Sequence, residues 1–321
     1  MALGAAIRWL RPAALVLGAA LGLTACVSPV SPTLAPAPRP ALPPAASGPT
    51  PQSDESRQLA TYYGRLQQDL LAQGLLRTDG GGPDVPFSKR NLVDNFVRIA
   101  LFDEYASAAG LLIQRQTASN LRRWSGPVRF GVQFGDSIPL AQRSKDTAVV
   151  TSYAARLARA TRHPISTSNS NPNFHVLILN EDERRSIGPT LRRLVPGIAN
   201  SSVRTVENLP KPILCIVLAF SVGEGNYDYS NAVAVVRGEH TDLMRQSCIH
   251  EELAQGLGLA NDSPQARPSI FNDDEEFGLL TRHDELLLRM LYDRRLSTGM
   301  TAASARPIAE VIAGELLGGG S

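Results

Sequence analysis

The residues that could do chemistry gather most densely in one segment, which reads CIHEELAQGLGLAND from Cys248 to Asp262. The segment combines a thiol, an imidazole and three carboxylates. Such groups act in proteins as nucleophiles, general bases and metal ligands. Because most of them recur at helical spacing, the orientation of one helix decides which of them face a common site.

The order of these residues invites comparison with HExxH, a helical motif in which two histidines four residues apart bind zinc and the glutamate is the general base. His250 and Glu251 match its first two positions. The match fails at the second ligand position, because Ala254 has no ligand atom. In this register the segment cannot hold zinc as such peptidases do.

A shift of one residue gives a second register. Glu251 and Gln255 then take the two ligand positions, and Glu252 takes the position of the general base. Gly258 matches the downstream glycine of the longer motif HExxHxxGxxH, and Asn261 its third ligand. In this register the segment resembles the zincin metallopeptidases.

Helix geometry, at about 100° per residue, favours the second register. Glu251 and Gln255 share one face with Met244 and Cys248, and His250 leans toward the other. That other face carries the apolar residues Ile249, Leu253 and Leu257. Zincins pack the apolar face of such a helix on a sheet and turn its polar face to a cleft. The resemblance therefore implies a zincin-like domain with Glu252 as the candidate catalytic residue.

The ligand types do not suit zinc, which binds cysteine, histidine and carboxylate. Gln255 and Asn261 are poor zinc ligands. No cofactor is firmly expected; zinc, if present, would be held by Glu251 with Gln255, His250 or Asp262. Three interpretations stay open: a zincin-like fold with a degraded metal site, a polar helix face packed on loops, and an unusual working metal site.

The chain has three cysteines, of which Cys26 lies in the N-terminal segment described below. In an oxidising compartment, the remaining Cys215 and Cys248 are expected to form a disulfide. Two alternatives remain: a metal-binding or catalytic role, with a thiol activated by His250 in the catalytic case, and a pair of buried free thiols. A second acidic run, from Asn272 to Asp274, could bind Ca²⁺ but lacks the spacing of an EF-hand loop. More simply, Asp273 or Asp274 would start a short helix reaching Phe277.

The elements that must position these residues can be read from periodicity. Helices are expected over residues 53–73, 88–105 and 147–160, with others starting at Asn180 and at Thr241, the latter ending at Gly258. A C-terminal helix is expected over about 304–317, its docking left open. Strict alternation predicts a strand over 128–134, and apolar runs predict strands over 174–179, 213–220 and 232–236. This order indicates an α+β fold with a mixed sheet packed with helices.

The segments around the key helix carry a second resemblance. HEELAQ is followed by ND at Asn261, by FNDD at Phe271 and by LT at Leu280. With these motifs, the chain resembles a bacterial lipoprotein family named for its domain of unknown function 2927. The resemblance covers about residues 153–300. It implies a location in the cell envelope, and no activity, since the family has none assigned.

The N-terminus agrees with that location. Arg8 and Arg11 precede an uncharged apolar run over residues 13–23, too short to span a bilayer. The run ends in LTAC, which resembles the lipobox of bacterial lipoproteins. Residues 1–25 are therefore expected to be a lipoprotein signal peptide, and Cys26 the first, acylated residue of the mature chain. Val27, in place of the aspartate typical of inner-membrane retention, favours the outer membrane, facing the periplasm.

Residues 26–52 are expected to be a proline-rich tether, and residues 53–321 a single globular domain. The formal net charge of +2 and the spread of arginine along the chain argue against a nucleic-acid surface. The expected partners are the membrane, through Cys26, and an unidentified envelope protein or polymer. Two functions remain: a non-catalytic binding domain, or a metal-dependent hydrolase of peptide or peptidoglycan-like bonds with Glu252 as general base.

Overall fold

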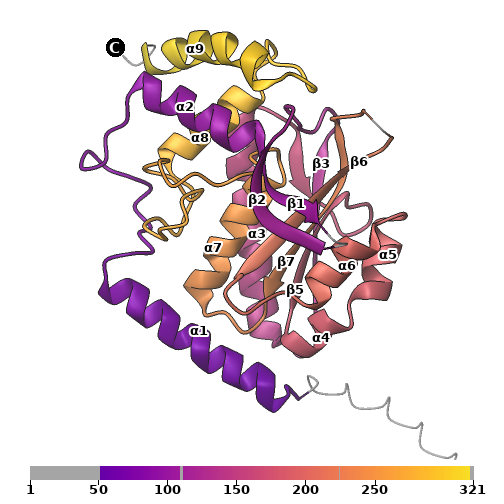
Figure 1. The fold of residues 1–321 in the computed structure, drawn as a ribbon. Coiled ribbons are helices and arrows are strands. Elements are labelled where there is room, and N and C mark those ends of the chain that lie inside the picture. The colour runs from indigo at the N-terminus through magenta and orange to yellow at the C-terminus, as the bar shows by residue number, and fades with distance from the viewer. Residues whose placement is uncertain (1–50, 109–110, 224, 319–321) are drawn as a thin grey trace, which may run out of the picture. The chain divides into compact units, whose positions relative to one another are not determined.

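The alternating and apolar segments of the sequence form one five-stranded sheet in the computed structural model, which describes residues 51–108, 111–223 and 225–318 (Figure 1). The strand order is β4-β3-β5-β7-β6. The strands are β3 (Val128–Phe134), β4 (Ile165–Thr167), β5 (Phe174–Leu179), β6 (Cys215–Ser221) and β7 (Tyr229–Arg237). All neighbours are parallel except β6, which pairs antiparallel with β7 and forms one edge. The expected α+β class with a mixed sheet is confirmed.

Strand β5 shows why its sequence is apolar without interruption. All six of its residues are buried, because both faces of the sheet are covered. Phe174, Val176 and Ile178 belong to the core that contains α3 (Leu140–Thr161) and α7 (Asp242–Gln255). Leu177 and Leu179 point the other way. They pack in a second core with α5 (Gly188–Leu194) and α6 (Asn200–Glu207), which follow the short helix α4 (Glu181–Arg185).

The remaining helices lie outside this sheet. The C-terminal helix α9 (Ala302–Gly318) packs on α2 (Lys89–Ala100) and α8 (Arg282–Leu291), which settles where it docks (Figure 1). Helix α1 (Asp54–Ala72) packs its Tyr63 against His240, just before α7. Among the described residues, no helix has the length and apolar character needed to cross a bilayer.

Several expected boundaries were wrong. The helix that starts after Ser88 ends at Ala100 and not near Tyr105, because β1 (Phe102–Ala108) and β2 (Leu111–Ala118) form an antiparallel hairpin that was not predicted. The helix predicted from Asn180 is the single short α4, and the chain turns again into α5 and α6. No helix starts at Asp273 or Asp274, since Glu275 adopts a left-handed backbone with φ of 57°.

Helix α7 begins after Thr241 as expected. It ends at Gln255 with Gly256 as its C-cap, and not at Gly258 as predicted. Gly258 has φ of 126° and lies against the carbonyl of Arg122, which a β-carbon would approach to 2.2 Å. Its role is therefore a close approach of two backbone segments rather than helix termination. The lipidation site, signal peptide and tether lie outside the described residues, apart from Pro51 and Gln52.

Candidate functional site

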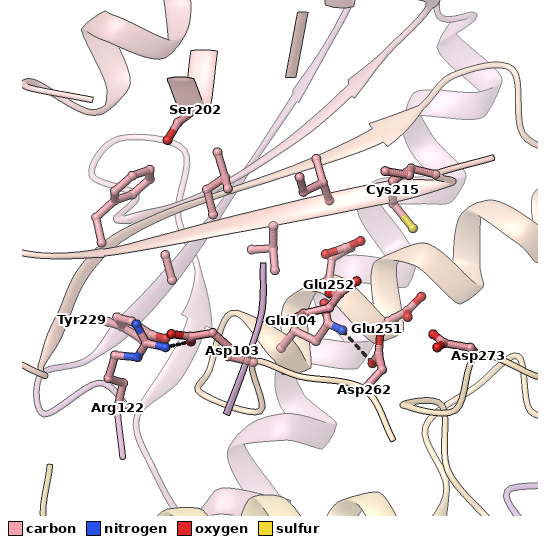
Figure 2. A pocket seen from close by; sticks show the side chains of 18 of the residues that line it. Asp103, Glu104, Arg122, Ser202, Cys215, Tyr229, Glu251, Glu252, Asp262 and Asp273 are labelled. Atoms are coloured by element: carbon pink, nitrogen blue, oxygen red, sulfur yellow. Dashed lines mark hydrogen bonds and ion pairs between the residues drawn. The ribbon is translucent and has the colours of Figure 1, made fainter. Parts of the chain in front are cut away.

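A cleft of about 460 Å³ lies beside the polar face of α7 (Figure 2). One wall is the edge strand β6, and others come from the start of the β1–β2 hairpin and from the loop after α7. The side chains that can do chemistry there are Asp103, Glu104, Arg122, Ser202, Tyr229, Glu251, Glu252, Gln255, Asp262 and Asp273. We call this site the acidic cleft, because six of these side chains are carboxylates and one is a guanidinium.

The disulfide expected between Cys215 and Cys248 is formed, with 5.9 Å between the two Cα atoms. It joins β6 to α7 and therefore ties together two walls of the cleft. The sulfur of Cys215 lies within 4.8 Å of carboxylate oxygens of Glu251 and Glu252. Because both sulfurs are bonded to each other, neither cysteine can be a thiolate nucleophile or ligand in this state. The alternative of a thiol activated by His250 is thereby excluded.

The carboxylates converge from separate parts of the chain. Glu251 and Glu252 come from α7, Asp262 from the loop after it, and Glu104 from β1 (Figure 2). Gln255 belongs to the same group, because its Nε2 donates to Oδ1 of Asp262 at 3.0 Å. Three residues of the second register, Glu251, Glu252 and Gln255, line the cleft.

Glu252 is the most enclosed of these acids. Its side chain is 4% exposed, and its Oε2 is buried without a hydrogen-bond partner among the described residues. An unpartnered buried carboxylate oxygen costs several kcal/mol relative to water, unless it is protonated or binds a cation. Glu252 therefore needs either a proton or a cation within the cleft.

The electrostatics agree with this reading. Burial raises the pKa of Glu251 well above its ordinary value, and the negative charges of Asp262 and Glu252 raise it further. Burial also raises the pKa of Glu252, with Glu104 and Asp262 adding to the effect. The pKa of Asp262 is raised by burial and by Glu104, against a smaller lowering from the amide of Gln255. Like charges in a dry site cannot all stay ionised without a counter-charge.

His250 and Asn261, two candidates from the sequence, are not among the residues that line the cleft. Nδ1 of His250 accepts a hydrogen bond from the backbone N–H of Leu280 at 3.1 Å, and its ring stacks on Tyr153 with 4.0 Å between centroids. Burial lowers its pKa to about 3, so the ring is neutral. Nδ2 of Asn261 donates to the carbonyls of Arg98 and Asp262. Asp262, the residue after Asn261, does line the cleft.

Two acids of the cleft, Asp103 and Glu104, were missed by sequence reasoning. They sit on β1, where the sequence pattern favoured the continuation of a helix. Asp103 forms an ion pair with Arg122, the only guanidinium among the described lining residues. No local signal marks Glu104, because its place in the cleft depends on where the hairpin docks: its N–H donates to the carbonyl of Ala260.

In the run from Asn272 to Asp274, most side-chain hydrogen bonds are made within the same loop. Nδ2 of Asn272 donates to Asp274, and Oδ1 of Asp274 accepts from the backbone N–H of Glu276. Only Asp273 from this run lines the cleft, and it is exposed at the rim. The run is thus a turn that brings one more carboxylate to the acidic cleft.

Zinc does not fit this donor set. The lining side chains offer oxygen ligands only, since His250 is engaged elsewhere and the sulfur of Cys215 is in a disulfide. Six carboxylates line this one cleft, and among them Glu251 and Glu252 have carboxylate oxygens within 4.8 Å of each other. Oxygen-rich linings of this kind are typical of sites for hard cations such as Ca²⁺, Mg²⁺ and Mn²⁺. What the arrangement can do chemically is therefore to bind a hard cation, or to share protons among its carboxyl groups.

Comparison with known proteins places the chain in one family. No curated protein and no solved structure matches the chain significantly. A family model described as "Protein of unknown function (DUF2927)" matches residues 89–311. The matched region runs from α2 into α9 and includes the hairpin, β6 and α7, hence every wall of the acidic cleft. It is also wider than the region expected from sequence motifs, about 153–300. The chain therefore belongs to the DUF2927 family of proteins of unknown function.

Proposed function

We propose that the acidic cleft binds one divalent cation through carboxylate oxygens of Glu251, Glu252 and Asp262. The observation that carries this proposal is the buried, unpartnered Oε2 of Glu252 in a cleft lined by other carboxylates. A cation would supply that oxygen with a partner and would offset the repulsion among the three acids. Glu104 and Asp273 line the same cleft and add negative charge that attracts a cation.

Ca²⁺ is the cation that suits the cleft best. It takes six to eight oxygen ligands with flexible geometry, whereas Mg²⁺ demands a near-ideal octahedron and keeps several waters. The cleft offers carboxylates from two loops, a strand and a helix, which is an irregular and crowded oxygen set. We therefore expect Ca²⁺ to bind more tightly than Mg²⁺, with Mn²⁺ between them and Zn²⁺ disfavoured.

The proposed setting is the bacterial envelope. Cys26 is the proposed lipid anchor, residues 26–52 the tether, and the outer membrane facing the periplasm the proposed location. The Cys215–Cys248 disulfide supports an oxidising compartment. In this setting the domain is a non-catalytic binding module for an envelope protein or polymer, with the cation as part of its binding surface.

The cleft also supports the proposal of a zincin-like arrangement around α7. Ile249 and Leu253 of α7 pack in the core beneath the sheet, while Glu251 and Gln255 face the cleft. That is the arrangement which zincins use for their ligand-bearing helix. Here carboxylate and amide groups stand at the ligand positions, so the proposal is a scaffold of this kind whose site has changed its metal preference.

The test is calorimetric titration of the full-length chain, freed of metal with a chelator, with Ca²⁺, Mn²⁺, Mg²⁺ and Zn²⁺ in turn. We expect one Ca²⁺ per chain, and a loss of affinity of roughly tenfold or more for Glu252→Gln, from the removal of one charged ligand. Asp69→Asn, which removes an exposed carboxylate on α1, is the matched control and should bind like the parent. No heat of binding with any of the four metals would refute the proposal.

A second candidate function is a hydrolase in which Glu252 is the general base. It is favoured by the edge strand β6, which lines the cleft next to Glu252 and could pair with an extended peptide-like substrate. Here Glu252→Gln should abolish hydrolysis of peptides or peptidoglycan fragments and leave cation affinity nearly unchanged. Lost affinity in this variant instead makes Glu252 a ligand, and an unchanged hydrolytic rate excludes it as the base.

A further inference from the structure

A second cavity, of about 380 Å³, lies where α3, α8 and α9 meet. Its lining consists of four arginines, one acid and small or apolar side chains: Arg156, Arg159, Ala160, Arg282, Glu285, Leu286, Arg289 and Leu316. It shares no lining residue with the acidic cleft. We call it the arginine groove.

Helical spacing explains how four arginines reach one cavity. Arg156 and Arg159 are three residues apart on α3, and Arg282 and Arg289 are seven residues apart on α8. Residues at these intervals share one face of a helix. Since α3 and α8 pack against each other, the two arginine-bearing faces border the same groove.

The positive charge of the groove is mostly uncompensated. Arg156 forms an ion pair with Glu285 at 2.7 Å and also donates to the carbonyl of Leu280. Among the described residues, Arg159, Arg282 and Arg289 form no ion pair. The Nη1 of Arg289 is moreover buried without a hydrogen-bond partner. Buried guanidinium N–H groups are normally satisfied, so an acceptor is missing from this groove.

We propose that the arginine groove binds a phosphate group. Guanidinium groups match phosphate oxygens with paired hydrogen bonds, and three unpaired arginines exceed the charge of one phosphate monoester or diester. Leu286 and Leu316 add an apolar surface next to the cationic rim. The phosphate could therefore be free, or could belong to the headgroup of an anionic phospholipid whose apolar part contacts these leucines.

The experiment has two arms, both with the full-length chain. One arm titrates inorganic phosphate calorimetrically. The other measures co-sedimentation with vesicles of phosphatidylglycerol and phosphatidylcholine, against vesicles of phosphatidylcholine alone, so that binding through the N-terminal segment is subtracted. The double variant Arg159→Gln, Arg282→Gln removes two exposed guanidiniums of the groove, and Arg65→Gln on α1 removes one elsewhere.

We expect the double variant to weaken binding roughly tenfold or more in at least one arm, as charge-assisted hydrogen bonds are lost, and Arg65→Gln to leave it unchanged. An effect on phosphate titration identifies a free-phosphate site. An effect confined to the anionic vesicles identifies a headgroup site. Equal binding by the parent chain and the double variant in both arms, or no binding in either, overturns the proposal.

Discussion

Glu181 and Glu252 are two of the buried carboxylates in the described part of the chain, and arginine neutralises only the first of them. Glu181 of α4 is 5% exposed and bonds Arg184 at 2.5 Å, Arg237 at 2.8 Å and Arg185 at 2.9 Å. Glu252 of α7 is 4% exposed, yet in the described part of the chain it forms no ion pair. Similar burial thus occurs with opposite electrostatic surroundings.

The pKa values follow the same contrast. Burial alone would raise the pKa of Glu181, but Arg184, Arg237 and Arg185 together hold it below its ordinary value. In the acidic cleft burial raises the pKa of Glu252, and its neighbours, which are acids, raise it further. A carboxylate that serves the fold is compensated by side chains of the fold itself. Glu252 has no such partner among the described residues and lies in a cleft lined by other carboxylates, which is the physical argument for the proposed cation site.

The largest expected effect on stability comes from removing the charge of Glu181. Glu181→Gln leaves the buried guanidiniums of Arg184 and Arg237 without their counter-charge, which should lower the free energy of unfolding by about 3–5 kcal/mol. Urea denaturation of the full-length chain followed by circular dichroism would measure it. A loss below about 1 kcal/mol would mean that this cluster is not a structural one.

Loss of the disulfide should have the next largest effect. Cys215 and Cys248 are 33 residues apart. A disulfide that closes a loop of this length lowers the entropy of the unfolded chain and stabilises the fold by about 3–4 kcal/mol. The double variant Cys215→Ser, Cys248→Ser should lose about that much stability. Because the bond ties β6 to α7, the variant should also bind Ca²⁺ more weakly than the parent. Unchanged Ca²⁺ affinity would mean that the two walls are held together without it.

A substitution at Glu252, which has no arginine partner, should stabilise the metal-free fold instead. Without a cation, Glu252→Gln removes a buried acid whose ionisation is opposed by burial and by neighbouring acids, and should raise the free energy of unfolding by about 1–2 kcal/mol. Addition of Ca²⁺ should stabilise the parent more than this variant. Urea midpoints of the two chains, each with a chelator and with Ca²⁺, would measure both effects, and Asp69→Asn is the control. Destabilisation of the metal-free variant would place Glu252 in a structural role instead.

The pH dependence of stability gives the smallest and finest test. Burial, followed by Asp273 and Asp274, raises the pKa of Glu275 to about 7, so the folded chain binds a proton here that the unfolded chain has lost above its ordinary pKa. This contribution to the stability of the cation-free protein is complete below the unfolded pKa and is lost as the pH rises through 7. Glu275→Gln should therefore flatten the slope between pH 5 and 8, by less than about 1.4 kcal/mol per pH unit.

Two buried histidines lower the stability of the fold at acid pH. Burial lowers the pKa of His240 and of His250 to about 3 each. The unfolded chain binds protons at both positions below about pH 6.5, whereas the folded chain does not. Stability from these groups is complete above that pH and is lost as the pH falls toward 3. A denaturation series that shows no acid loss in this window would contradict the neutral state of both rings.

Local patterns in the sequence were sufficient where one element determines the outcome. The strict alternation of β3, the continuous apolar run of β5 and the two faces of α7 all follow from burial on defined sides. The hairpin β1–β2 was missed because its first strand follows the last turn of α2 without a break in composition. Glu104 was missed with it, because the docking of a hairpin is a tertiary feature that no local period records. The sequence also could not show that Asp262 lines the cleft and Asn261 does not, because that depends on the path of a loop.

Scanning calorimetry tests most directly whether a hard divalent cation completes the acidic cleft. The full-length chain would be freed of metal and then scanned with a chelator, with Ca²⁺, and with Ca²⁺ after Glu251→Gln or Glu252→Gln. We predict that Ca²⁺ well above its dissociation constant raises the parent's Tm by about 5 °C or more, and that either variant loses most of this rise. Equal Tm values with chelator and with Ca²⁺ would contradict the account.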